Sequence, residues 1–162
     1  MSIRKLGCGG VEYYLSQVTA GVEDYYLADS EAPGLWLGHG ADALGWAGEI
    51  DADDLRAALA GLDRNGARLA RQRSKVPGFD VTLSAPKSVS LLWALGDRQV
   101  STEVSAAHDE AVRQAISHLE RHLCFTRRGK DGRTTIAGDG LVAAGFRHCT
   151  SGAGHRQLPP TC

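Results

Sequence analysis

The sequence predicts a single domain of mixed α/β class, and three stretches carry this prediction. Residues 79–84 alternate apolar and polar side chains, as a half-buried strand does, and Ser84 followed by Pro86 signals the start of a helix. Residues 99–123 repeat apolar side chains every three or four positions, or at multiples of these, which indicates a long amphipathic helix. Residues 124–138 favour a β-hairpin that turns at 130–132. A chain of 162 residues is long enough to bury the core of one such domain.

The remaining elements follow from similar patterns. In chain order they are a strand at 2–6, a helix at 11–19, an irregular glycine-rich segment at 28–48, a short helix at 51–61, a helix at 86–95 and an inner strand at 141–148. Trp36 and Trp46 are expected to hold the irregular segment to the core. The short helix has acidic residues in its first turn and Gly61 after its end, as helix termini prefer.

Bulk properties exclude several classes of protein. The net charge is −1, which gives no overall attraction to nucleic acid or membrane. No apolar run approaches the roughly 20 residues that span a bilayer, and no signal-peptide pattern opens the chain, so the expected location is the cytoplasm. The four cysteines have no C-x-x-C spacing, which speaks against a zinc knuckle or a redox motif.

Positive charge is nevertheless concentrated in two short stretches. Their members are Arg68, Arg71, Arg73 and Lys75 in the first, and Arg127, Arg128, Lys130 and Arg133 in the second. Clusters of this size can contact phosphates, and they are also common on solvated surfaces. Composition alone leaves both interpretations open.

All the tyrosines of the chain lie in one stretch, VEYYLSQVTAGVEDYY. They form two adjacent pairs, Tyr13–Tyr14 and Tyr25–Tyr26. If residues 11–19 are helical, Tyr14 shares a face with Val18 while Tyr13 points about 100° away, so one can be buried and the other available. A buried aromatic cluster is one explanation. A set of nucleophiles is the other, although a phenol, which ionises near pH 10, needs a base or a charge-stabilising metal to attack.

The stretch FDVTLSAPKSVSLLWAL resembles the signature segment of conjugative relaxases of the TrwC/TraI type, the MobF class. The paired tyrosines, the segment GLVAAGFRH and the Gln-Leu nine residues after it fit the same family, so the similarity extends from about Leu6 to Leu158. The resemblance implies an antiparallel β-sheet flanked by helices, the palm of a relaxase or HUH endonuclease. It implies nicking of one strand of single-stranded or hairpin DNA at a transfer origin, together with other conjugation proteins.

The resemblance also implies roles for individual residues. Tyr13 corresponds to the first nucleophile and Tyr25 to the second, with Tyr14 and Tyr26 as their neighbours. Asp80 corresponds to a carboxylate that activates the tyrosine or orients a metal-binding histidine. His148 corresponds to the first of three histidines that hold a divalent metal such as Mg²⁺ or Mn²⁺. Without the resemblance, Asp80 reads as a solvent-facing carboxylate and His148 as an ordinary hydrogen-bonded histidine.

The sequence departs from the family where the second and third histidines are expected. Pro159 and Thr161 stand at those positions. Residues 1–162 are therefore expected to be the N-terminal part of a relaxase domain whose C-terminal part is missing. A frameshift that truncated the gene would explain this ending. Three interpretations stay open: a nicking enzyme, a non-catalytic domain that binds single-stranded DNA, and a pseudogene product.

Two further features resemble functional motifs. His118 and His122 have the i, i+4 spacing of a helical metal site, but no third ligand is placed to complete it, and a solvated helix face is the favoured interpretation. The segment GDGLVAAG is rich in glycine but lacks the strand-to-helix form of a phosphate-binding loop, so it predicts a turn.

Overall fold

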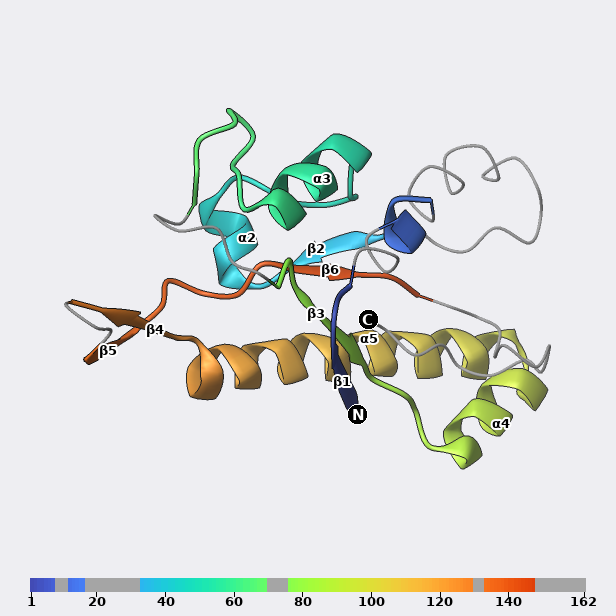
Figure 1. Cartoon of the computed structure of the whole chain (residues 1–162). Helices are drawn as coiled ribbons and strands as arrows, with labels where there is room; N and C mark the ends of the chain where they lie inside the picture. Colours follow the sequence, from blue (N-terminus) through green and yellow to red (C-terminus); the bar gives the residue numbers. More distant parts are fainter. Residues whose placement is uncertain (8–11, 17–32, 70–75, 130–132, 148–162) are drawn as a thin grey trace.

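The computed structural model describes residues 1–7, 12–16, 33–69, 76–129 and 133–147 (Figure 1). Residues 12–16 are helical. The other elements, in chain order, are β1 (Ser2–Lys5), β2 (Leu35–Leu37), α2 (His39–Ala43), α3 (Ala52–Ala60), β3 (Phe79–Thr82), α4 (Lys87–Leu95), α5 (Arg98–Leu123), β4 (Phe125–Arg128), β5 (Thr134–Ala137) and β6 (Ala143–Gly145). No helix in these ranges is long and apolar enough to cross a membrane.

Every strand pairing in the described ranges is antiparallel. β1 pairs with β3, β2 with β6, and β4 with β5. The antiparallel fold class is thus confirmed, and the expectation that residues 79–83 and 141–148 share one sheet stays a prediction. In the described ranges, β3 and β6 lie in separate two-stranded ladders.

The helices lie on two sides of the β2–β6 pair, with α2 and α3 on one side and α5 on the other (Figure 1). α4 packs against α5, where the Trp93 indole N–H donates to Ser105 Oγ at 3.0 Å. Asp97 caps α5 by accepting a hydrogen bond from Val100 N. Both predicted helices are confirmed, and α4 begins directly after the Ser84–Pro86 start signal, with Pro86 at the N-cap and no side-chain capping bond.

The hydrophobic core lies between the β2–β6 pair and the helices α2 and α3. Trp36 and Trp46 are buried and stack with ring centroids 5.0 Å apart, so the prediction that they hold this segment to the core is confirmed. The prediction of an irregular segment is wrong for residues 35–43, which form β2 and α2. Stacking of two indoles buries enough apolar area to order these short elements, which have little stability of their own.

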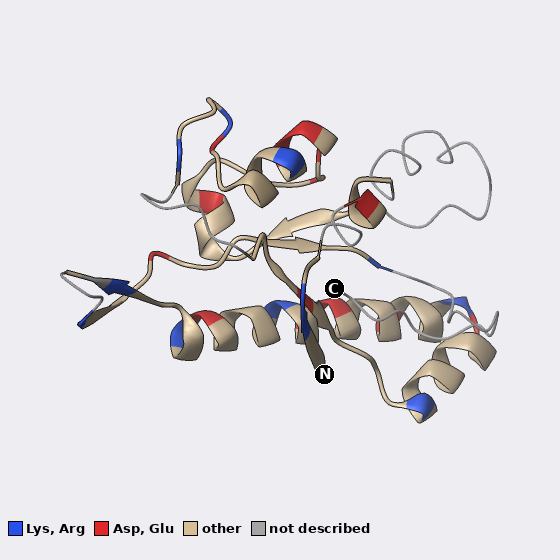
Figure 2. Cartoon of the chain, viewed as in Figure 1, with Lys and Arg blue, Asp and Glu red and all other residues tan. Residues whose placement is uncertain are grey.

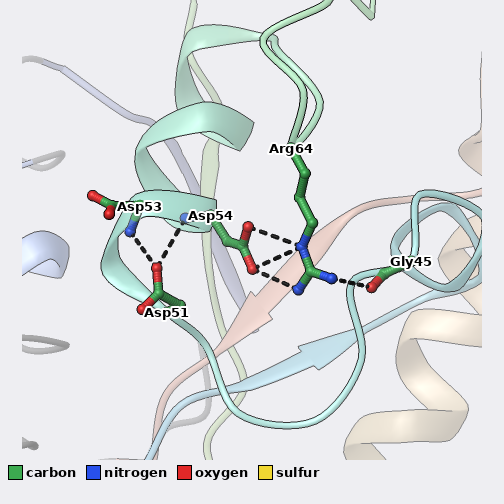
Figure 3. A network of polar contacts seen from close by, with 5 residues as sticks. All are labelled: Gly45, Asp51, Asp53, Asp54 and Arg64. Carbon is green, nitrogen blue, oxygen red and sulfur yellow. Dashed lines mark hydrogen bonds and ion pairs between the residues drawn. The ribbon is translucent and has the colours of Figure 1, made fainter.

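A polar network fixes α3 to the loop that follows it (Figure 3). Asp51 caps the helix by accepting from Asp53 N at 2.7 Å, and Gly61 ends it in the left-handed conformation, as the sequence predicts. Arg64 donates to both oxygens of Asp54 and, through Nη1, to the carbonyl of Gly45 at 2.8 Å. The hydrogen bonds from Arg64 outweigh burial and lower the pKa of Asp54.

The predicted hairpin is confirmed as β4 and β5, which extend away from the rest of the molecule (Figure 1). Phe125 lies opposite Ala137 and Arg127 opposite Thr135. Gly138 N donates to the carbonyl of Cys124 at 2.8 Å and closes the base of the hairpin against the end of α5.

Candidate active site and nucleic-acid interface

Tyr13 and Tyr14 lie in the helical segment 12–16 and have different surroundings. Tyr14 stacks on Phe146 with ring centroids 5.3 Å apart and an interplanar angle of 27°. Tyr13 meets Tyr14 edge to face at 5.3 Å and is 49% exposed. The expectation that one member of the pair packs on the core while the other stays accessible is therefore confirmed.

Phe146 connects this segment to the end of β6. It is 6% exposed and belongs to the core together with Trp36. The next residue, Arg147, forms an ion pair with Asp109 in the middle of α5. The backbone that leads into His148 is thus held by an aromatic stack on one side and an ion pair on the other.

Asp80 lies in β3, where it is the register partner of Arg4 in β1. Its Oδ1 atom is buried and has no hydrogen-bonding partner among the described residues, whereas its neighbour Phe79 is 60% exposed. Asp80 is thus not the solvent-facing carboxylate that the strand pattern suggests without the resemblance. Ile3, on the same face of the β1–β3 ladder as Phe79, is also 51% exposed, and Ser2 and Arg4 on the opposite face of β1 are exposed as well.

Seven of the predicted site residues fall outside the described residues. They are Tyr25, Tyr26, His148, Arg71, Arg73, Lys75 and Lys130. For Arg128 the structure describes the backbone within β4 only. The predicted convergence of Tyr13, Asp80 and His148 therefore remains a prediction.

Glu120, which the sequence patterns did not indicate, connects three segments. Its carboxylate accepts hydrogen bonds from His39 N at 2.7 Å and Leu141 N at 2.9 Å, and it meets His39 Nδ1 at 2.7 Å. The Glu120 side chain is 8% exposed, whereas that of His39 is 78% exposed. The contact fixes the C-terminal part of α5 to the start of α2 and to the segment that leads into β6. We call these three residues the Glu120 clamp.

Glycines allow the clamp to form. Gly140 has φ +126°, and a Cβ there would clash with the backbone nitrogen of Gly40. Gly40 N in turn donates to the carbonyl of Leu141 at 3.0 Å. The segment GDGLVAAG, for which the sequence predicts a turn rather than a phosphate loop, is thus a close-packed connection.

The charges of the Glu120 clamp stabilise one another. Burial opposes ionisation of Glu120, but hydrogen bonds from His39 and from the Leu141 N–H outweigh it and lower the pKa of Glu120. The hydrogen bond to Glu120 raises the pKa of His39, and the negative charge of Asp42 adds to this effect.

Basic residues are prominent along the β4–β5 hairpin (Figure 2). Arg127 and Arg133 are exposed, and Phe125, two residues before Arg127 and so on the same strand face, is 57% exposed. Arg68 is exposed in a separate loop, where it bridges to Leu62. An exposed aromatic ring beside an arginine suits nucleotide stacking and phosphate contact. The sequence patterns did not indicate Phe125, because an aromatic residue in a predicted strand reads as a core residue.

A shallow apolar recess of about 480 Å³ adjoins the signature segment. Its lining includes Ser84, Ala85 and Pro86 from the turn before α4, together with Val104 and His108 from α5. Within the described ranges, no group of three or more His, Cys, Asp or Glu side chains is placed to hold a metal ion.

Comparisons with known proteins agree on one family. The TrwC relaxase family model matches residues 8–159. The multifunctional conjugation protein TraI of Escherichia coli K12 is 36% identical over 154 residues, which are 92% of this chain and 8% of TraI. The chain thus spans less than a tenth of this curated relative.

Solved structures of TrwC resemble the chain over 99% of its length. TrwC complexed with a 27-mer DNA comprising the recognition hairpin and the cleavage site has a TM-score of 0.74 at 31% identity, and 53% of that chain is covered. A copper-bound TrwC in complex with oriT DNA has a TM-score of 0.76 at 34% identity, with 55% covered. The match to the family over most of the sequence, joined to this likeness in structure, shows that the chain belongs to the TrwC relaxase family.

Proposed function

We propose that residues 1–162 form part of a relaxase domain that binds single-stranded or hairpin DNA at a transfer origin and presents Tyr13 for strand nicking. Relatives that are conjugative relaxases in complex with oriT DNA support the substrate. The observation that carries the proposal is the stack of Tyr14 on Phe146, because it brings the exposed Tyr13 to the end of β6, just before His148 in sequence. Because the substrate would be plasmid DNA, we place this activity in the cytoplasm, alongside other conjugation proteins.

The proposed reaction is a transesterification. The Tyr13 hydroxyl loses its proton and its oxygen attacks the phosphorus of a phosphodiester. A phosphotyrosine ester forms, the bond to one sugar oxygen breaks, and the released strand end takes up a proton as a hydroxyl. The ester keeps the energy of the broken bond, so the strand can be rejoined. Tyr25 would perform a second transfer, with Tyr14 and Tyr26 as neighbours of the two nucleophiles.

Asp80 is proposed to act beside the tyrosine. A buried carboxylate oxygen without a partner is costly, so Oδ1 of Asp80 is expected to receive a hydrogen bond when the site is complete. The donor would be the Tyr13 hydroxyl, whose proton Asp80 would accept, or the imidazole of His148, which Asp80 would orient.

The metal that the family implies does not fit the donors of this chain. A catalytic site of this kind takes three protein ligands around an open position. His148 can supply one imidazole, but Pro159 has no donor side chain and Thr161 offers only a neutral hydroxyl. We therefore assign no step of the reaction to a metal, and we expect the chain as given to nick DNA slowly.

DNA contact is proposed to involve the hairpin and the preceding basic loop. The residues are Arg127, Arg128, Lys130 and Arg133 with Phe125, and Arg68, Arg71, Arg73 and Lys75. Phosphate contacts of this kind lose affinity steeply as salt rises. A second candidate function, a DNA-binding domain without catalysis, is favoured by one observation, the absence of histidine at positions 159 and 161.

The test is cleavage of an oligonucleotide that carries a recognition hairpin and a nick site, with Mg²⁺ or Mn²⁺. The chain as given is compared with Tyr13→Phe, and with Pro159→His/Thr161→His. A covalent DNA adduct that requires Tyr13 and increases in the histidine variant supports relaxase chemistry. DNA binding without adduct in either form supports the binding domain. An adduct that survives Tyr13→Phe refutes the assignment of the nucleophile.

A further inference from the structure

Two imidazoles lie side by side near the end of α5. His118 and His122 are both exposed, and their ring centroids are 4.3 Å apart with an interplanar angle of 44°. The spacing i, i+4 on a helix places two side chains on the same surface, one turn apart. In the described part of the chain, no hydrogen bond or ion pair occupies either ring.

The neighbouring charged groups leave this pair of rings accessible. Arg121, which lies between them in sequence, turns its Nε toward the carbonyl of Ser117 at 3.3 Å. The Glu120 carboxylate is committed to the clamp with His39 and Leu141 and is 8% exposed. Among the described residues, the two imidazoles are therefore the ligands that this surface offers, and water would complete the coordination.

The geometry suits a late first-row transition metal. Such ions bind imidazole nitrogen at about 2.0–2.1 Å, which puts two nitrogens on one ion about 3 Å apart. Rings with centroids 4.3 Å apart reach that separation by small side-chain rotations. A cation near the C-terminal end of a helix is also favoured by the helix dipole. Imidazole prefers Zn²⁺, Cu²⁺ and Ni²⁺ to Mg²⁺, which takes oxygen ligands.

We propose that His118 and His122 form a two-imidazole chelate for a divalent ion such as Ni²⁺, Cu²⁺ or Zn²⁺, separate from the histidine set that the relaxase family uses. The bound ion would join the last turns of α5, next to the base of the β4–β5 hairpin. This inference is independent of the proposed nicking activity. It has a practical consequence, because transition-metal binding by this chain would not by itself report the nuclease site.

The test is titration of the untagged chain with Ni²⁺, since a polyhistidine tag would bind the same ion. Calorimetry and the rise of the thermal midpoint with Ni²⁺ measure binding, because a ligand that binds only the folded state stabilises it. We expect one binding step that is lost in His118→Ala and in His122→Ala. The matched control His122→Ala/Leu123→His keeps two histidines but moves them to i, i+5, and it should also lose the step. Leu123 is 63% exposed, so this change should not disturb folding.

Two further variants separate this site from others. His108→Ala, on the same helix, and His148→Ala should both keep the Ni²⁺ step. The proposal would be overturned if the i, i+5 variant kept the Ni²⁺ binding step. It would also be overturned if His148→Ala lost that step while His118→Ala and His122→Ala kept it. DNA binding and adduct formation in Mg²⁺ should be unchanged in His118→Ala. The Ni²⁺ step therefore tests the chelate, and the DNA adduct tests the nicking proposal, so the two proposals can fail separately.

Discussion

Replacing Glu120 by alanine should destabilise the fold more than any other single carboxylate change on α5. The substitution removes the acceptor for His39 N and Leu141 N and leaves the partly buried Leu141 N–H without a partner. A hydrogen bond to a charged group contributes about 1.5–3 kcal/mol. The hydrogen bonds between Glu120 and His39 lie at the surface, where water replaces a lost partner. We therefore count less than their full contribution to the free energy of unfolding. We expect a total loss of about 2–3 kcal/mol, or about 4–12 °C in the thermal midpoint of a domain of this size.

Urea and thermal unfolding at pH 7 measure this loss, with two variants beside Glu120→Ala. Glu120→Gln keeps an acceptor oxygen but no charge, so it should lose about half as much. Glu110→Ala removes an exposed carboxylate paired with Arg113 on the same helix, and its midpoint should equal that of the wild type. A Glu120→Ala midpoint within error of the wild type, or a larger loss for Glu120→Gln than for Glu120→Ala, would refute the reasoning.

The clamp also predicts how stability changes with pH. The lowered pKa of Glu120 means that its contribution is present above the ordinary value of 4.5 and is lost as the pH falls through the folded-state value. The raised pKa of His39 means that its contribution is complete below 6.5 and is lost as the pH rises through the folded-state value. Both dependences should shrink in Glu120→Gln, and unfolding midpoints measured from pH 3 to 9 check this.

Three other substitutions test separate features of the molecule. Arg64→Ala should lower the thermal midpoint and return the pKa of Asp54, measured by NMR, toward its ordinary value, because it removes the hydrogen bonds that lower it. Arg127→Ala should weaken binding of single-stranded DNA and reduce the slope of log affinity against log salt by about 0.7, the contribution of one phosphate contact. Gly140→Ala should lower the thermal midpoint well beyond Gly66→Ala, because both glycines have positive φ but only Gly140 packs against another backbone.

Controls for these substitutions come from the same chain. Arg56→Ala removes an exposed arginine that pairs with Asp53 on α3, and it should leave the Asp54 titration and the salt slope unchanged. An Asp54 titration unaffected by Arg64→Ala, or a salt slope that Arg56→Ala lowers as much as Arg127→Ala does, would contradict the assigned contacts. Equal effects of the two glycine substitutions would mean that strain alone, without packing, limits position 140.

Local patterns in the sequence determined the elements that depend on near neighbours. α3 was predictable because Asp51 caps it and Gly61 ends it, both within one turn of the helix. α5 was predictable because its apolar repeat continues over 26 residues, and the hairpin because its turn residues separate two short strands. The relaxase family was also evident from sequence, since its signature is a continuous stretch of residues.

Only the tertiary structure decided which side chains meet across the chain. Glu120 reads as one more surface acid on an amphipathic helix, and its role depends on backbone N–H groups 81 and 21 residues away. The alternation around Asp80 predicted a strand but did not indicate that Oδ1 of Asp80 is buried, because alternation shows that the two faces differ and not which one the rest of the fold covers. The stack of Tyr14 on Phe146, which brings Tyr13 to the end of β6, joins segments 132 residues apart, and contacts at that separation leave no periodic trace in the sequence.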